Sequence, residues 1–203
     1  MTPASELGPW VPLEVETTVE VLDGAPFLWW LGGGRALELH LGRSWRGHDD
    51  TDVGVLRRQL DAVWAALSGW GWQVAVAAAG QLRPWGGEPL DPDRHENNLW
   101  CRREGGGWQL DVTIGEGDET TWVFRRDPRI RWPMEEAVLR TADGVPYLAP
   151  ELQLLFKSEA PREKDDVDTR EVIPELDPTR RARLADLLPG DHPWERLLRE
   201  RPR

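Results

Sequence analysis

Two aspartates, Asp50 and Asp52, stand two residues apart at the start of a segment, residues 50–56, in which polar and apolar side chains alternate. This alternation predicts a half-buried strand, in which both carboxylates project to one side with Cα atoms about 6.6 Å apart. Two-metal phosphoryl transfer uses carboxylate oxygens that bridge Mg²⁺ ions. The pair therefore predicts a metal site for phosphoryl chemistry.

A third carboxylate is expected from a neighbouring strand. Residues 108–114 place Asp111 on one face, while Leu110, Val112 and Ile114 occupy the other. Aspartate is unfavourable in strands, so its presence here suggests that a site requires it. An edge strand with its aspartate in water is the alternative. We predict Asp111 as a metal ligand, as a general base, or as both.

Three glycines, residues 32–34, lie between a predicted strand at residues 27–31 and a predicted helix at residues 35–41. Bare backbone amides at the start of a helix bind phosphate, because they donate hydrogen bonds at the positive end of the helix dipole. Gly33 and Gly34 are therefore candidate nucleotide contacts. A purely structural turn would have the same sequence.

Other site types fit less well. An EF-hand over residues 50–61 fails, because Val55 stands where that loop needs glycine. Neither a Walker motif nor a Gly-x-Ser-x-Gly elbow occurs. The single cysteine, Cys101, excludes an internal disulfide framework and a multi-thiolate metal site. His48 beside Asp50 and Asp52 could bind zinc, but hard oxygen donors favour Mg²⁺.

The pattern of elements predicts an α+β fold with a mixed β-sheet flanked by helices and a C-terminal helical segment. Further helices are predicted at residues 13–22 and 57–67, and further strands at 73–77, 99–103 and 121–124. The strand at 121–124 is expected to form a hairpin with the strand at 108–114. A proline- and glycine-rich loop is expected at 84–92. The helical segment comprises residues 150–157, 165–173 and 178–188 and a short turn at 192–198.

Composition limits the partners. The chain has 203 residues and a formal net charge of −11, which disfavours binding to a nucleic-acid backbone and fits a neutral or cationic substrate. The 13 tryptophans are scattered along the chain, as core residues would be. Neither a secretory signal nor a membrane span is recognisable. We expect a cytoplasmic protein without a membrane partner.

Residues 30–53 closely resemble the aminoglycoside 2''-adenylyltransferase-like family of nucleotidyltransferases. The glycines, a short helix, Gly42-Arg43, Arg46, His48 and Asp50-x-Asp52 follow in the family's order and spacing. A second block, residues 144–157, followed by Lys164-Asp165 and Asp168, looks like the C-terminal helical part of such proteins. Two departures stand out: Arg35 replaces an expected aromatic residue, and Trp45 an expected threonine. Arg35 could touch the nucleotide or mark a changed acceptor pocket.

The resemblance implies the nucleotidyltransferase fold, with a catalytic core at residues 1–135 and a helical segment at residues 136–203 packed on it. It implies that Asp50 and Asp52 hold Mg²⁺, as two ions, and that Asp111 supplies the third carboxylate. Bound nucleotide is expected to contact Gly33, Gly34, Arg46, His48, Lys157 and Lys164. The two lysines, the only ones in the chain, suit the β- and γ-phosphates. Surface ion pairs with Glu163, Asp165 and Asp168 are the alternative for them.

The expected reaction transfers a nucleoside monophosphate, AMP from ATP in the first instance, to a hydroxyl of a small molecule. ATP or another nucleoside triphosphate would be the co-substrate. An acidic cleft would attract a cationic aminoglycoside as the acceptor. Transfer to RNA or to a protein, as in toxin-like relatives, is the alternative reaction. A nucleotide-binding module that has lost catalysis is the alternative class.

Overall fold

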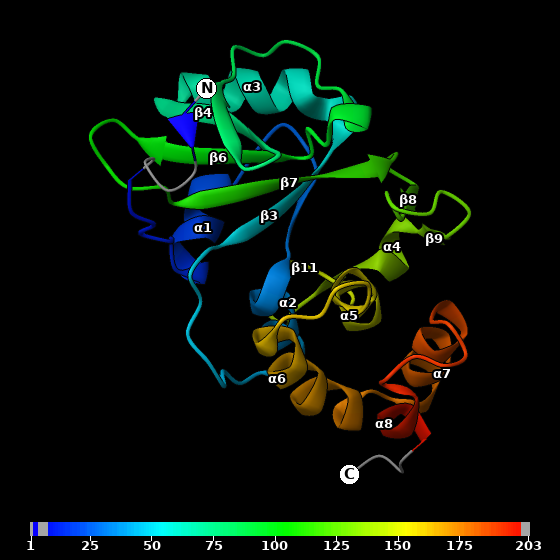
Figure 1. The fold of residues 1–203 in the computed structure, drawn as a ribbon. Helices are drawn as coiled ribbons and strands as arrows, with labels where there is room; N and C mark the ends of the chain where they lie inside the picture. Colours follow the sequence, from blue (N-terminus) through cyan, green and yellow to red (C-terminus); the bar gives the residue numbers. More distant parts are fainter. Residues whose placement is uncertain (1, 4–7, 200–203) are drawn as a thin grey trace.

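A mixed β-sheet runs through the protein, and helices pack against it (Figure 1). The computed structural model describes residues 2–3 and 8–199. Neighbouring strands follow the order β1-β5-β4-β6-β7-β3-β2-β11-β10, while β8 and β9 extend β7 as a side branch. The strands are β1 (Thr2–Pro3), β2 (Trp29–Leu31), β3 (Asp52–Leu56), β4 (Trp72–Ala78), β5 (Gln81–Pro84), β6 (Asn98–Arg103), β7 (Leu110–Gly117), β8 (Thr121–Val123), β9 (Arg131–Pro133), β10 (Val138–Arg140) and β11 (Pro146–Leu148).

The centre of the sheet aligns two of the predicted site strands. β3 and β7 run parallel, with Asp52 directly opposite Asp111, and β2 pairs antiparallel with β3. β8 pairs antiparallel with β7, which confirms the predicted hairpin. Parallel and antiparallel pairs thus occur in one sheet, and the predicted mixed α+β fold is confirmed.

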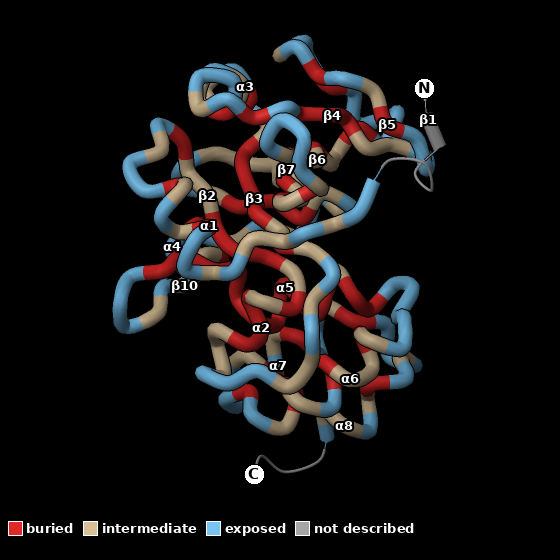
Figure 2. The backbone as a smooth tube through the Cα atoms, turned by 90° about the vertical axis from the view of Figure 1, so that its left-hand side faces the viewer, coloured by how far each residue is buried: buried red, intermediate tan, exposed pale blue. Residues whose placement is uncertain are grey.

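Two large hydrophobic clusters make up most of the core, and a third, small one contains Ala75, Leu82 and Trp108. The first lies between the sheet and the helices α1 (Val15–Leu22) and α3 (Leu60–Gly69). The second joins the β8 side of the sheet to α2 (Gly33–Leu41) and to the helices that follow β11. Buried segments follow the central strands and α5 in Figure 2. Six of the tryptophans are buried, as expected of core residues: Trp30, Trp72, Trp85, Trp108, Trp122 and Trp194.

The C-terminal helices form a group below the sheet in Figure 1. They are α5 (Pro150–Ser158), α6 (Glu163–Val172), α7 (Pro178–Leu187) and the short α8 (Glu195–Arg199), and Pro150 and Pro178 stand at first-turn positions. The strands β10 and β11 also lie after residue 135 and belong to the sheet. The division at residue 135 stays a prediction. No helix in the described residues is long and apolar enough to cross a membrane.

Several boundaries differ from those predicted. Helix α2 starts at Gly33 rather than at residue 35, and it ends as predicted at Gly42, which has a φ of 66°. The predicted helix at 57–67 begins as a 3₁₀ turn, Arg57–Gln59, before α3. The strands β5, β9, β10 and β11 and the one-turn helix α4 (Met134–Ala137) were not predicted. Except for β5, with four residues, each of these strands has three, too few for alternation to mark them.

Candidate active site

A cavity of about 410 Å³ opens between the central strands, the β7–β8 hairpin and the segment from α5 to α6. The predicted carboxylates Asp50, Asp52 and Asp111 all line it. Other walls come from the glycine turn at residues 32–34 and from aromatic side chains such as Phe156. The structure therefore gathers residues from four separate segments of the chain around one space.

The three carboxylates lie where strands β3 and β7 begin. Asp52 and Asp111 are register partners, and the backbone of Asp111 donates a hydrogen bond to the Thr51 carbonyl at 2.9 Å. β3 begins at Asp52, so the predicted strand start at Asp50 is wrong by two residues. Asp50 lies in the loop before the strand because the ladder ends there, yet it lines the same cavity.

Burial and like charges make the carboxylates hard to ionise without a cation. Burial, followed by repulsion from Asp50, raises the pKa of Asp52 to about 6. Burial and then the charge of Asp52 raise the pKa of Asp111 to about 8, although Asn98 donates a hydrogen bond to Asp111 Oδ1 at 2.8 Å. Both carboxyls would ionise more readily if positive charge entered the cavity.

The donor chemistry fits Mg²⁺, since three carboxylates offer hard oxygen ligands and their mutual repulsion favours a cation between them. Within residues 2–3 and 8–199, however, no three His, Cys, Asp or Glu side chains form a group that could hold a metal ion as they stand.

The glycine turn packs tightly against the carboxylates. Gly33 has a φ of 61°, and a Cβ at this position would collide with the Asp52 carboxylate. A Cβ on Gly34 would collide with the side chains of Arg46 and His48. The Gly33 amide donates a hydrogen bond to Gln153 Oε1 at 2.9 Å. Both glycines are thus required by close packing, and in this structure the Gly33 amide is committed to α5.

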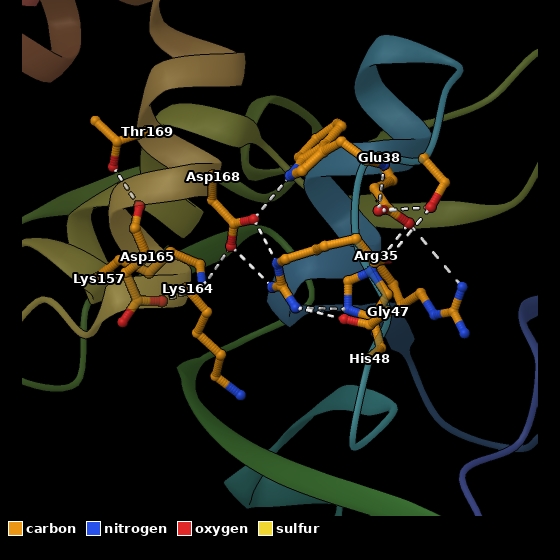
Figure 3. A network of polar contacts seen from close by, with 12 residues as sticks. Arg35, Glu38, Gly47, His48, Lys157, Lys164, Asp165, Asp168 and Thr169 are labelled. Atoms are coloured by element: carbon orange, nitrogen blue, oxygen red, sulfur yellow. Dashed lines mark hydrogen bonds and ion pairs between the residues drawn. The ribbon is translucent and has the colours of Figure 1, made fainter.

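Arg46 and His48 belong to a network of buried charges beside the cavity (Figure 3). The Arg46 guanidinium binds Asp168 with two bonds, from Nε at 2.7 Å and from Nη2 at 2.9 Å. His48 Nε2 lies 3.0 Å from Glu38 Oε2 on α2. Burial lowers the pKa of His48, although the hydrogen bond to Glu38 acts in the opposite direction. Contact of Arg46 and His48 with a nucleotide stays a prediction.

The two lysines differ in their surroundings. Lys157 is buried, and its Nζ lies 2.6 Å from Asp165 and 3.1 Å from Asp168. Lys164 is partly exposed, and its Nζ lies 3.9 Å from Asp49. Lys164 makes no marked contact with the network in Figure 3. Of the two, only Lys157 is fully neutralised by carboxylates of the protein.

The network lowers the pKa values of its acids. Burial would raise the pKa of Asp168, but Arg46, Lys157 and the Trp45 indole lower it. Asp165 behaves likewise: Arg162 and Lys157 hold its pKa below the usual range despite burial. Each of these carboxylates is therefore a stable anion with its charge compensated inside the protein.

The two departures from the family pattern have separate explanations. The Trp45 indole donates to Asp168 Oδ1 at 3.0 Å, so it is part of the network. Arg35 donates to Glu14 Oε2 at 2.9 Å and lines a different hollow on the outer side of α2. Arg35 is absent from the lining of the carboxylate cavity, and the expectation that it touches the nucleotide gains no support.

Sequence reasoning missed several cavity residues, among them Asn98, Gln153 and Arg125. Asn98 holds Asp111, Gln153 holds Gly33, and Arg125 lies at the far end of the β7–β8 hairpin. Gln153 lies in the second family-like block, and Asn98 directly precedes a predicted strand. Arg125 directly follows a predicted strand, but no spacing pattern distinguishes it from other arginines.

Residues 14–83 match the model of the aminoglycoside-2''-adenylyltransferase family. The fold is similar to that of ANT(2'')-Ia in complex with adenylyl-2''-tobramycin, with a TM-score of 0.57 and 18% identity over 85% of this chain and 94% of that one. It is also similar to the lincomycin-bound lincosamide antibiotic adenylyltransferase LnuA, with a TM-score of 0.54 and 18% identity over 81% of this chain and 97% of that one. No curated protein matches the chain.

The family match covers the glycine turn, Asp50 and Asp52 and ends before Asp111. It confirms the predicted family resemblance, and the structural similarity confirms the predicted nucleotidyltransferase fold. The family match also supports the prediction of a nucleotidyltransferase enzyme.

Proposed function

The chain resembles the aminoglycoside-2''-adenylyltransferase family and has the nucleotidyltransferase fold, and from this premise we propose that it transfers a nucleoside monophosphate to a small molecule. The donor is a nucleoside triphosphate, with ATP the first to test, and the acceptor group is a hydroxyl. Pyrophosphate is the second product. The protein acts in the cytoplasm in this proposal.

One observation carries the proposal: Asp50 and Asp52 from one segment and Asp111 from another line one cavity beside the glycine turn. Asp52 and Asp111 are paired by the β3–β7 register, so their relative position is fixed by backbone hydrogen bonds. Burying like charges together is unfavourable, so carboxylates placed together in a cavity indicate a functional site. Binding of a cation and a triphosphate is such a use.

Asp50, Asp52 and Asp111 would hold Mg²⁺, as two ions. Bound there, Mg²⁺ would neutralise charge on the phosphates and polarise the α-phosphorus. The acceptor oxygen bonds to the α-phosphorus, and the bond from that phosphorus to the β-bridging oxygen breaks. Pyrophosphate leaves with the electron pair. The hydroxyl proton passes to the Asp111 carboxylate, which positive charge in the cavity keeps ionised.

The other predicted nucleotide contacts divide into two groups. In this proposal Gly34 and Lys164 face the nucleotide directly, and the Gly33 amide does so on leaving Gln153. Arg46, His48 and Lys157 are bound to carboxylates of the protein, and they shape the cavity wall beneath it. They would reach a phosphate only by leaving those partners.

The acceptor is proposed to be a hydroxylated small molecule. ANT(2'')-Ia was solved with adenylyl-2''-tobramycin and LnuA with lincomycin, so relatives of this fold accommodate antibiotics. A cationic aminoglycoside is one candidate, and a lincosamide is another. The net charge of −11 makes RNA a less favourable target.

The test incubates the protein with Mg²⁺, α-labelled nucleotides and a panel of aminoglycosides, lincosamides, RNA and cell protein. We expect label transfer to a small molecule, and Asp52→Asn should reduce it at least 100-fold, the order expected when a group that stabilises transition-state charge is lost. The matched variant Asp61→Asn, on the exposed face of α3, should retain it.

Absence of transfer to every acceptor, with nucleotide binding retained, would indicate the inactive binding module. Transfer to RNA or protein alone would replace the small-molecule proposal. If no nucleotide binds, the enzyme reading is wrong.

A further inference from the structure

Six cations line the carboxylate cavity, and four of them are already neutralised within the protein. Arg46 binds Asp168 and Lys157 binds Asp165. The other two pairs join Arg162 to Asp165 at 2.9 Å and Arg126 to Glu159 at 3.1 Å. In the described residues, the ion-pair partner of Lys164 is the exposed Asp49, at 3.9 Å. A cation bound to a carboxylate has little charge left for a ligand.

Arg125 is the exception. In the described part of the chain its guanidinium makes no ion pair with any carboxylate. It donates a long hydrogen bond to the Ile114 carbonyl at 3.4 Å and lies 5.3 Å from the centre of the Phe156 ring. It is half-buried and lines the cavity. Burial, with the nearby charge of Arg126, lowers the pKa of Arg125. A desolvated guanidinium without a counter-ion is unfavourable, and an anion would relieve it.

The place of Arg125 relative to the carboxylates is fixed by β7. The Ile114 carbonyl that it contacts lies three residues along this strand from Asp111. At about 3.3 Å per residue, that carbonyl lies roughly 10 Å along the strand from Asp111. Asp111 and Asp52 are nonetheless close enough to influence the pKa of Arg125. One end of the cavity is therefore acidic and the other end holds an uncompensated cation.

We propose that Arg125 binds the β- and γ-phosphates of the nucleoside triphosphate, with the α-phosphate beside the carboxylates. This inference rests on the proposed function and adds to it a residue outside the family-like blocks. The planar guanidinium can donate two parallel hydrogen bonds to phosphate oxygens. It would also stabilise the charge that develops on the departing pyrophosphate.

The experiment measures binding of ATP and AMP in the presence of Mg²⁺ by calorimetry, without an acceptor. Arg125→Gln should weaken ATP binding by about 10- to 100-fold, as expected for lost hydrogen bonds between charged groups. AMP has no β- or γ-phosphate, so its affinity should change less than about 3-fold by the same reasoning. Arg125→Lys, which keeps the charge, should recover part of the ATP affinity.

The matched control is Arg126→Gln. Arg126 is next in sequence, stacks on the same Phe156 ring at 5.4 Å and lines the same cavity, but it is paired with Glu159. We expect less than about a 3-fold change in ATP affinity. Equal losses for both variants would show a general charge effect and overturn the role of Arg125.

The outcomes separate this inference from the proposed function. If the wild-type protein binds ATP and Arg125→Gln binds it equally well, the inference is wrong and the proposed function stands. If Arg125→Gln weakens the binding of AMP as much as the binding of ATP, Arg125 does not contact the β- and γ-phosphates. If Arg125→Gln fails to fold, Arg125→Lys is measured in its place. The inference is overturned if both Arg125→Lys and the wild type bind ATP no more tightly than AMP. If the wild-type protein binds no nucleotide, both the inference and the proposed function are wrong.

Discussion

Two groups of buried charge lie side by side in this protein, and they are arranged in opposite ways. In the cavity, Asp52 and Asp111 face each other without an ion-pair partner, and their pKa values are raised to about 6 and about 8. In the adjoining network, Asp165 and Asp168 are bound by arginine and lysine, and their pKa values are lowered. The same residue type thus has opposite ionisation behaviour because its neighbours differ.

The difference separates residues that hold the site from residues that are free to bind. Asp168 is fully buried and joins α6 to Trp45, Arg46 and Lys157. These contacts connect the C-terminal helices to the loop that leads to Asp50. In the described residues Asp52 and Asp111 form no ion pair, which is the state expected of groups that receive a cation from solution.

Breaking the network should produce the largest effect on stability. Asp168→Asn would leave Arg46 and Lys157 buried with one less negative charge, and we expect a loss of about 3–5 kcal/mol in the free energy of unfolding. Urea unfolding followed by tryptophan fluorescence measures it. Asp166→Asn, two residues earlier on the same helix and only partly buried, should cost less than about 1 kcal/mol. Similar losses for both variants would mean that the network does not hold the helices in place.

Neutralising a cavity carboxylate should have a smaller effect of opposite sign. The folded-state pKa of Asp111 is about 8, above the ordinary 3.8, so the charged carboxylate destabilises the fold above pH 8 and this cost disappears as the pH falls toward 4. In a chelator, Asp111→Asn should therefore unfold several degrees above the wild type at pH 9, because the wild-type fold then contains the charged carboxylate.

That difference should decrease as the pH falls below 8 and vanish near pH 4, where Asp111 is protonated in both the folded and the unfolded state. His40 and His48, whose pKa values are lowered by burial, act in the opposite sense, but they are present in both proteins and cancel from the comparison. Asp61→Asn provides the surface control. A stabilisation that is the same at pH 5 and pH 9 would show that the carboxylate is not held protonated by its neighbours.

The smallest change in stability is expected at Lys164, the cation that belongs to neither arrangement. Its partner Asp49 is 92% exposed and 3.9 Å away, so Lys164→Gln should alter the free energy of unfolding by less than about 0.5 kcal/mol. The matched variant Lys157→Gln removes a buried positive charge that is paired with Asp165 and Asp168. It should lower the free energy of unfolding by about 3 kcal/mol. Thermal melting of both variants makes the comparison. Equal losses of stability in the two variants would show that Lys164 also belongs to the buried network.

Much of the local structure could be predicted from the sequence. Alternating residues marked the core of β3 and β7, and glycines marked both ends of α2, because these signals depend on neighbours only a few residues away. The short strands β9, β10 and β11 could not be predicted, since three residues give no period and pairing with other strands stabilises them. The family-like spacing led to the fold class even so.

The sequence by itself determined which chemical groups the chain brings together locally: two aspartates two residues apart, a third in a strand, and a glycine turn before a helix. Only the tertiary structure decided which charges are compensated. Arg46 and Asp168 are 122 residues apart and form a two-bond pair, whereas Arg125 meets no carboxylate in the described residues. Spacing along the chain fixes side-chain direction over a few residues, but ion pairing depends on distances of a few ångströms between segments that only folding brings together.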